Sequence, residues 1–215
     1  MKEKMFYILI VFLLGNCGTF IKAQENIFGF GDYGSRFGEY GLSVVIDNKV
    51  KFYGFNEVWV GLPEFDFILP NSYKNIFVMH NSDIGLLFGV VIDNKVKLYG
   101  FDDDVWIEVP GLEGILPNGY KNVLGIDVDF GFLGDIGFIG VVVDDKIKFY
   151  YFNMGGFLSE MSEIEFVLPN GYKNVYISDV GEITLGVLVD DKVKFYELCD
   201  GGTWVEILES EFNLR

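Results

Sequence analysis

One nine-residue segment occurs four times in this chain with few changes. The copies read IDNKVKFYG, IDNKVKLYG, VDDKIKFYY and VDDKVKFYE, and they begin at Ile46, Ile92, Val143 and Val189. The Asp in the second position of each copy recurs after 46, 51 and 46 residues. A period of this length is typical of propellers and solenoids, in which one small unit packs against its own copies. We therefore expect an array of similar units.

A second motif recurs with the first. ILPNSYKN begins at Ile68, ILPNGYKN at Ile115 and VLPNGYKN at Val167, which are 47 and 52 residues apart. The segment ENIFGF at residues 25–30 parallels KNIFVM at residues 74–79, so the beginning of the chain supplies a further copy. Four units of 42 to 52 residues, starting near residues 26, 75, 122 and 174, thus fill residues 24–215 as a single repeat domain.

Within a unit, the residue pattern predicts β-strands joined by tight turns. Val, Ile, Phe and Tyr are abundant and Ala is nearly absent, which favours strand over helix. The apolar run GLLFGVVID (85–93) is typical of a buried strand, and the following Asn or Asp tolerates the left-handed backbone of a two-residue hairpin. The segment KVKFYGF then alternates Lys49, Lys51 and Tyr53 with Val50 and Phe52, as in a strand with one wetter face.

The remaining part of each unit completes a four-stranded blade. VWVGLP and VWIEVP predict short strands that end at Pro63 and Pro110, and LPNGYKN predicts a turn before the next unit. The fold class is therefore all-β, a β-propeller-like array of four four-stranded blades. Such an array is either closed as a small ring or completed by self-association. Equivalent buried positions are predicted on the strand after each hairpin, at Val50, Val96, Ile147 and Val193.

The repeat resembles that of the regulator of chromosome condensation family. In that family an aliphatic strand leads through a turn beginning with Asp into a strand ending in Trp-Gly, and here TLGVLVDDKVKFYE (184–197) and LFGVVIDNKVKLYG (87–100) are similar. The resemblance implies a propeller, although family members usually have about seven blades, a His before the aliphatic strand and Gly in the turn, and this chain has none of these. NGYKN and DDKVKFY also resemble elements of the tachylectin type of propeller lectin.

The first 23 residues have the pattern of a secretory signal peptide. Lys2 and Lys4 precede an apolar run from Met5 to Gly15, and a short polar stretch ends at Ala23. A run of eleven residues is too short to span a bilayer comfortably, so we expect cleavage after Ala23 and no transmembrane segment in the mature chain. The protein would then be secreted or periplasmic. The alternative is a lipoprotein anchored through Cys17, which follows Leu14 and Gly15 as in an acylation box.

Charge and cysteine content narrow the possible partners. Without residues 1–23 the chain has 13 basic and 31 acidic side chains, a net charge of −18. Such a chain offers no counter-charge to nucleic acid or to an anionic membrane, and the charge also favours solubility. If Cys17 is removed with the leader, Cys199 is the remaining cysteine and no intrachain disulfide is possible. We interpret Cys199 as a buried or idle thiol, because His80 is the only histidine that could activate it.

Two sets of repeated side chains are candidates for ligand binding. The first set lies in the LPN[GS]YKN motif, where Tyr and Asn beside a turn are expected to be partly exposed. Its members are Tyr73, Tyr120 and Tyr172 with Asn71, Asn118 and Asn170. The second set is made of tryptophans at equivalent positions before the motif, Trp59, Trp106 and Trp204. Either these indoles line sugar-binding clefts or they fill the core between blades.

No residue pattern predicts catalysis or a bound cofactor. The chain has one His and no G-x-S-x-G, H-E-x-x-H or phosphate-cradling loop. The repeated D-[ND]-K carboxylates are interpreted as solvated hairpin turns and not as calcium ligands, because each turn has two residues and a Lys follows. We therefore expect an exported, non-catalytic binding module for a protein or surface partner, with contacts in the unequal segments around Phe130–Gly140. The alternative is a lectin that binds glycans multivalently through the LPN[GS]YKN turns.

Overall fold

The computed structural model describes residues 27–30, 40–56, 58–81, 85–102, 105–126, 137–153, 155–178, 183–190, 192–199 and 201–207. Four antiparallel sheets follow one another along the chain, and strands adjacent in sequence pair with each other. The first sheet contains β1 (Ile27–Phe30), β2 (Tyr40–Ile46), β3 (Lys49–Asn56) and β4 (Val58–Gly61), with β5 (Phe67–Ile68) paired to β3 after the short 3-10 helix η2 (Pro63–Phe65). The second contains β6 (Tyr73–Asn81), β7 (Gly85–Ile92), β8 (Lys95–Asp102) and β9 (Val105–Ile115).

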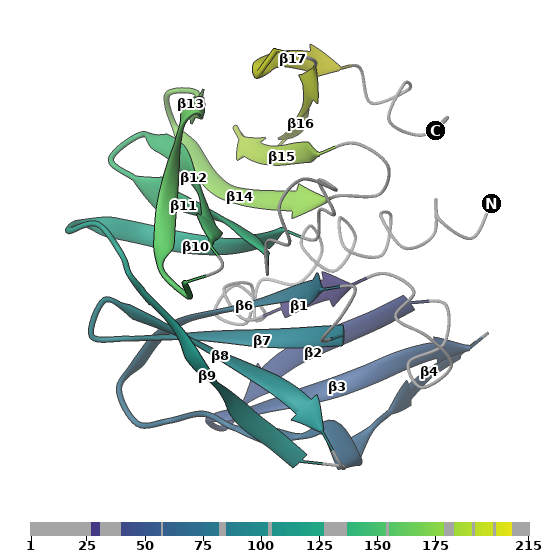
Figure 1. Cartoon of the computed structure of the whole chain (residues 1–215). Helices are drawn as coiled ribbons and strands as arrows, with labels where there is room; N and C mark the ends of the chain where they lie inside the picture. The colour runs from purple at the N-terminus through teal and green to yellow at the C-terminus, as the bar shows by residue number, and fades with distance from the viewer. Residues whose placement is uncertain are drawn as a thin grey trace.

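The third and fourth sheets have the same order. They contain β10 (Tyr120–Ile126), β11 (Phe138–Val143), β12 (Lys146–Phe152) and β13 (Leu158–Val167), followed by β14 (Tyr172–Ser178), β15 (Thr184–Val189), β16 (Lys192–Cys199) and β17 (Thr203–Ile207). The sheets are arranged as the blades of a four-bladed propeller, with the first strand of each sheet toward the centre and the last strand outside (Figure 1). The predicted all-β array of four four-stranded blades is therefore confirmed.

The inner strands of neighbouring blades approach closely at one glycine. A Cβ on Gly125 in β10 would overlap the backbone carbonyl of Val78 in β6. Only glycine leaves room for this approach, because any side chain there would push the two inner strands apart. The second and third blades are thus in direct backbone contact near the centre of the molecule.

The repeated D-[ND] turns are tight hairpins, as the sequence predicts. Asp47 and Asn48 have φ of 51° and 60°, and Asp93 and Asn94 have φ of 49° and 63°. Two consecutive residues in the left-handed region define a type I′ turn, whose twist matches that of the flanking strands. Asn and Asp occur here because they tolerate that region better than other side chains.

The two repeated motifs bind each other. The backbone N–H of Leu116, from the LPN motif that ends the second blade, donates to the carbonyl of Asn94 in the hairpin turn of the same blade, at 2.8 Å. Leu168 donates likewise to Asp145 at 2.8 Å, and Leu69 donates to Asn48 at 3.1 Å. The three leucine side chains are buried. We name this contact the turn clasp, and it explains why the two motifs recur together.

Apolar clusters join successive blades. Val50 and Phe52 of β3 face the second blade, Val96 and Leu98 of β8 face the third, and their side chains are almost completely buried. Ile147 and Phe149 of β12 face the fourth blade in the same way. The alternate residues of these strands are Lys and Tyr, which are generally less buried and point toward the preceding blade. The alternation predicted from KVKFYGF is therefore confirmed.

The prediction for Val193 is wrong. Its equivalents Val50, Val96 and Ile147 are fully buried, whereas Val193 is only partly buried. Val193 lies on the flank of the fourth blade that faces away from the third. Among the side chains that the structure describes, no cluster of buried apolar residues joins the fourth sheet to the first.

Two boundaries also differ from the sequence prediction. β4 ends at Gly61 before Pro63, as expected, but β9 continues through Pro110 to Ile115. A register shift between Lys97 and Tyr99 marks a bulge there, and a bulged outer strand tolerates a proline because it need not donate a ladder hydrogen bond. In addition, the Tyr-Lys-Asn segments already belong to β6, β10 and β14, so these blades begin two residues earlier than predicted.

Truncating the equivalent core valines should have unequal effects. We expect Val96→Ala to lower the free energy of unfolding by roughly 2–4 kcal/mol, because it leaves a cavity between two blades. Val193→Ala should cost less than half as much, since Val193 is partly exposed. Urea denaturation of both variants measures the difference, and equal losses would show that the flank of the fourth blade is as well covered as the others.

Backbone strain in the turn before β6 and β10 can be tested by two opposite substitutions. Ser72 has φ of 69°, where Gly119 and Gly171 occupy the equivalent positions at 79° and 77°. Ser72→Gly should raise the free energy of unfolding by about 0.5–1 kcal/mol, because a side chain is disfavoured in the left-handed region. Gly119→Ser should lower it by a similar amount, since a Cβ there meets no neighbouring atom and only the backbone is strained. A change of the same sign in both thermal melts would refute this explanation.

Candidate functional site

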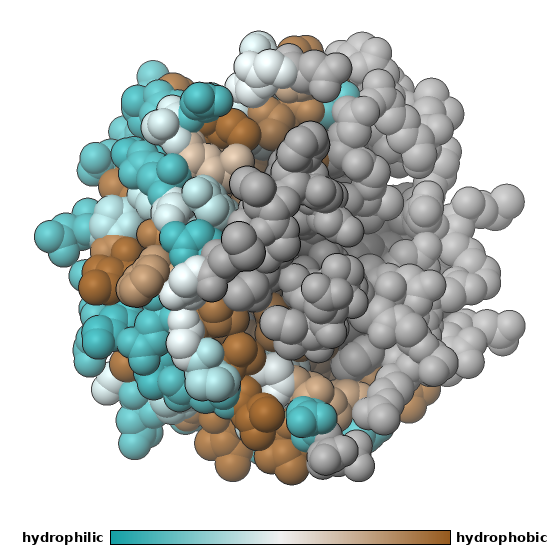
Figure 2. Space-filling model, viewed as in Figure 1, coloured by the Kyte–Doolittle hydropathy of each residue, from teal (hydrophilic) through white to brown (hydrophobic). Residues whose placement is uncertain are grey.

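The repeated turns gather on one face of the propeller. The hairpins between β7 and β8 and between β11 and β12 lie at the left of the view in Figure 1. The turn clasp brings the LPN motif to these hairpins, so the first residues of β10 and β14 lie on the same face. The left side of Figure 2 is largely teal, which shows that this face is mainly hydrophilic. We call it the turn face.

The predicted Tyr and Asn residues all lie on this face but differ in exposure. Tyr73, Tyr120 and Tyr172 are the first residues of β6, β10 and β14, and each is half-buried, in agreement with the predicted partial exposure. The Asn residues of LPN are exposed within the turns. They are Asn71, Asn118 and Asn170.

An open cleft lies between the second and third blades on the turn face. Its volume is about 390 Å³, and it is lined by Lys74, Asn94, Gly119, Tyr120 and Lys121. The ammonium of Lys74 lies 3.5 Å from Oδ1 of Asn94. The hydroxyl of Tyr120 is buried and has no hydrogen-bond partner among the described residues. Burial and, after it, the nearby Asp93 carboxylate raise the pKa of Tyr120, so this phenol is a neutral donor at physiological pH.

The junction between the third and fourth blades has the same parts in a different arrangement. Nζ of Lys121 lies 3.3 Å from Oδ1 of Asp145 and 5.8 Å from the centre of the Tyr172 ring. The hydroxyl of Tyr172 donates to the carbonyl of Asp144 at 3.5 Å. A carboxylate of the same blade thus pairs with the lysine at this junction, whereas an amide faces the lysine at the previous one.

The Asn residues of the YKN segments have a structural role. Nδ2 of Asn75 donates to Oδ1 of Asn122, which connects the inner strands of the second and third blades. Oδ1 of Asn122 also accepts from the backbone N–H of Val123 at 2.9 Å, next to a register shift in β10. These amides are therefore occupied by the protein itself.

The described tryptophans pack between blades. The Trp106 ring stacks on Phe52 of the first blade with centroids 5.5 Å apart, and its Nε1 donates to the carbonyl of Phe65 at 2.7 Å. The Trp204 ring stacks on Phe149 of the third blade at 5.6 Å. This geometry corresponds to the core interpretation of the two that the sequence leaves open. The side chain of Trp59 lies outside the described residues.

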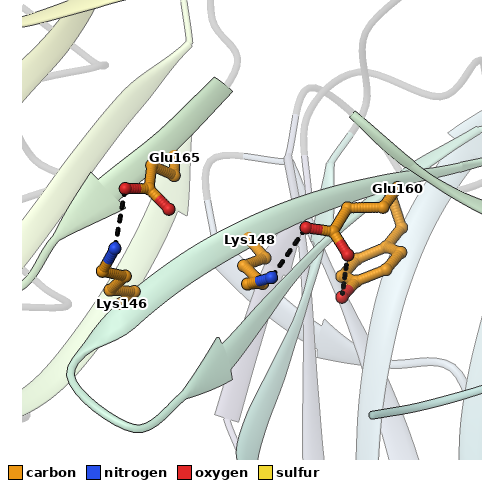
Figure 3. Close-up of polar contacts among 5 residues, drawn as sticks. Lys146, Lys148, Glu160 and Glu165 are labelled. Atoms are coloured by element: carbon orange, nitrogen blue, oxygen red, sulfur yellow. Dashed lines mark hydrogen bonds and ion pairs between the residues drawn. The ribbon is translucent and has the colours of Figure 1, made fainter. Parts of the chain in front are cut away.

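A set of Lys, Glu and Tyr side chains recurs on the flanks of the blades. Lys97 contacts Glu108 at 2.8 Å, Lys148 contacts Glu160 at 2.7 Å and Lys194 contacts Glu206 at 3.0 Å, each between the third and fourth strands of a blade. Figure 3 shows the third-blade group, in which the hydroxyl of Tyr150 also donates to Glu160 at 3.3 Å. Each carboxylate forms an ion pair with the lysine on the neighbouring strand, so these groups stabilise the flanks as cross-strand pairs.

Other polar groups provide no further centre in the described ranges. Among those residues, no three His, Cys, Asp or Glu side chains lie close enough together to hold a metal ion. Cys199 is a partly buried free thiol, and the side chain of His80 lies outside the described residues. No helix in that part of the structure is long and apolar enough to cross a membrane. Of the segment Phe130–Gly140, which was expected to contact a partner, residues 130–136 lie outside the described residues. Phe138, Ile139 and Gly140 begin β11 and are buried, so for these three residues the prediction is wrong.

Sequence reasoning missed the lysines of the cleft. Lys74 and Lys121 are the central residues of two Tyr-Lys-Asn segments whose tyrosines were predicted as ligand-binding residues. Asn94 belongs to the repeated hairpin. The available signal was the change from Asn at positions 48 and 94 to Asp at positions 145 and 191. The effect of that change on binding can be inferred only from the structure, which shows that Lys74 lies beside Asn94 and Lys121 beside Asp145.

Comparison with known proteins supports the fold. No family model and no curated protein matches this sequence. The SapL1 lectin, solved in complex with alpha methyl fucoside, is 14% identical, with a TM-score of 0.50 over 84% of this chain and 62% of that chain. A functionally unknown protein from Desulfotomaculum acetoxidans DSM 771 is 17% identical, with a TM-score of 0.45 over 78% of this chain and 51% of that chain. This chain therefore spans less than two thirds of either, and the resemblance to the regulator of chromosome condensation family stays a prediction.

The Tyr150 hydroxyl should make stability fall at alkaline pH. Burial, followed by the charge of Glu160, raises the pKa of Tyr150 to about 12, while an unfolded tyrosine ionises near pH 10. The folded form is therefore fully favoured below pH 10 and loses this contribution as the pH rises to about 12. Tyr150→Phe should make the decline in unfolding free energy between pH 10 and 12 less steep. An unchanged slope in urea titrations across that range would contradict the assignment.

Proposed function

We propose that this protein is an exported, non-catalytic propeller that binds carbohydrate in the cleft between its second and third blades. The observation that carries the proposal is the composition of that cleft. Two lysines, a side-chain amide and a tyrosine line an open space of about 390 Å³, and they are Lys74, Lys121, Asn94 and Tyr120. Sugars present hydroxyl groups that both donate and accept hydrogen bonds, and these side chains provide matching partners.

The fold adds support for carbohydrate over other ligands. One structure with a similar propeller fold is a lectin, solved with a methyl fucoside. Closed or nearly closed arrays of blades also provide rigid surfaces for a site without requiring catalytic groups. The sequence analysis favoured a protein partner over a glycan. We place the glycan first here, because the cleft is lined by side chains that donate and accept hydrogen bonds.

Export is part of the proposal. Residues 1–23 lie outside the described residues, and their support is the leader pattern of Lys2, Lys4 and the apolar run that follows. Mass spectrometry of the protein recovered from outside the cytoplasm should give a chain beginning at Gln24. A chain beginning at a lipid-modified Cys17 would instead place the protein on a membrane surface.

A glycan array with one pair of variants tests the binding function. Tyr120→Ala should weaken binding of the recognised glycan by roughly tenfold or more, because it removes an aromatic side chain from the lining of the cleft. Tyr172→Ala is the matched control, since the equivalent residue at the next junction is already covered by Lys121. Both variants must give the thermal melt of a folded protein. An array without any bound glycan would refute the proposal, and equal losses in the two variants would place the site elsewhere.

A protein partner is the second candidate, and a repeated apolar feature favours it. Ile68, Ile115 and Val167, the residues before each LPN, are 73%, 76% and 62% exposed on the outer strands. Exposed aliphatic side chains at equivalent positions would give a partner protein a regular row of contacts. Ile115→Lys should then abolish capture of that partner without changing glycan binding.

A further inference from the structure

The junction between the third and fourth blades contains an internal carboxylate that shows how an anion fits the repeat. Lys121 is held at 3.3 Å by Asp145 and lies over the Tyr172 ring. Lysine, carboxylate and tyrosine thus contact one another at the surface, where the side chains of Lys121 and Asp145 are 52% and 76% exposed. At this junction the Asp145 carboxylate competes with any ligand anion for Lys121.

The junction between the second and third blades lacks that carboxylate. Asn94 occupies the position of Asp145, and its amide oxygen lies 3.5 Å from the ammonium of Lys74. Within the described part of the chain Lys74 forms no ion pair, and it lines the open cleft. An amide is a weaker partner for an ammonium than a carboxylate, because its oxygen has only a partial charge.

We infer that this cleft binds a sugar that has a carboxylate, and that the ligand's carboxylate takes the role at Lys74 that Asp145 has at Lys121. The inference rests on the proposed carbohydrate-binding function and adds the class of sugar. It also predicts a stoichiometry of one ligand for these two junctions. The ligand binds between the second and third blades, whereas between the third and fourth blades Asp145 already occupies the position of the ligand's carboxylate.

The surrounding charges determine how such a sugar would lie. The chain has a net charge of −16, so an anion is attracted here by the lysines that line the cleft, Lys74 and Lys121, and not by the protein as a whole. Asp93 acts electrostatically on Tyr120, so the anionic group is disfavoured beside that phenol. The carboxylate therefore lies toward Lys74, and neutral hydroxyl groups of the ring lie toward Tyr120 and Asp93.

Pairs of sugars that differ in one group test the inference. Methyl glucuronide differs from methyl glucoside only in having a carboxylate in place of a hydroxymethyl group. Methyl galacturonide and methyl galactoside differ in the same way. Calorimetry on the full mature chain should show at least one acidic sugar binding about tenfold or more tighter than its neutral counterpart, as expected for a charge-assisted hydrogen bond. The molar ratio should be one. Free acetate should bind far more weakly than the acidic sugar, which separates recognition of a saccharide from recognition of any carboxylate.

Reciprocal variants test whether the residue at positions 94 and 145 determines if a junction can bind the acidic sugar. Asn94→Asp should abolish binding of the acidic sugar, because it provides Lys74 with an internal carboxylate. Asp145 occupies the same sequence position in the third-blade turn, but Asn94 has φ of 63° and Asp145 has no positive φ, so a thermal melt must show that Asn94→Asp folds. Asp145→Asn should free Lys121 and raise the molar ratio from one to two. Lys74→Gln removes the ammonium directly and should reduce the preference for the acidic sugar to about equal affinity, even if Asn94→Asp fails to fold.

Three results distinguish this inference from the proposed function. Equal affinity for acidic and neutral sugars, unchanged by Asn94→Asp and Lys74→Gln, would refute the inference and leave carbohydrate binding in place. Acetate binding as tightly as the acidic sugar would refute saccharide recognition at Lys74. Failure of every sugar on the array and in calorimetry would refute both proposals.

Discussion

The turn clasp determines the shape of each blade and the start of the next one. A hydrogen bond of 2.8–3.1 Å joins the leucine N–H of the LPN motif to the hairpin carbonyl of the same blade, and the leucine side chain is buried beside it. Because the chain must then enter the next inner strand directly from this point, the following Tyr lies against the hairpin turn. The junctions on the turn face are therefore built from the two repeated motifs, and those at Tyr120 and Tyr172 have a lysine, a tyrosine and a turn residue at equivalent positions.

Function can differ between blades because this arrangement stays constant while single side chains change. Asn94 and Asp145 occupy the same turn position, yet the amide of Asn94 lies beside Lys74 in an open cleft, whereas the carboxylate of Asp145 forms an ion pair with Lys121. Neither residue alters the backbone hydrogen bond of the clasp, because that bond uses the main-chain carbonyl. A repeat protein can thus keep its folding contacts and vary its binding surface by substitutions of nearly equal size.

Much of the fold could be predicted from the sequence, because equivalent residues need equivalent surroundings. The hairpins and the alternation of Val50 and Phe52 with lysines followed from local pattern alone. Val193 was mispredicted because its burial depends on its place at the end of the array, which no local pattern contains. Pro110 was mispredicted because an outer strand can bulge around a proline. The cleft was only partly predicted, because Lys74 acquires its role from Asn94 across a turn twenty residues away.

Amide hydrogen exchange measured by NMR tests the clasp most directly. The amides of Leu69, Leu116 and Leu168 lie outside the strands, so exchange as slow as that of the core strands would arise from the bond to the hairpin carbonyl. We predict that these three amides are protected together, at the level of the central strands β7 and β11. Exchange as fast as that of exposed turn residues such as Asn118 would contradict the account, because the two repeated motifs would then not hold each blade together.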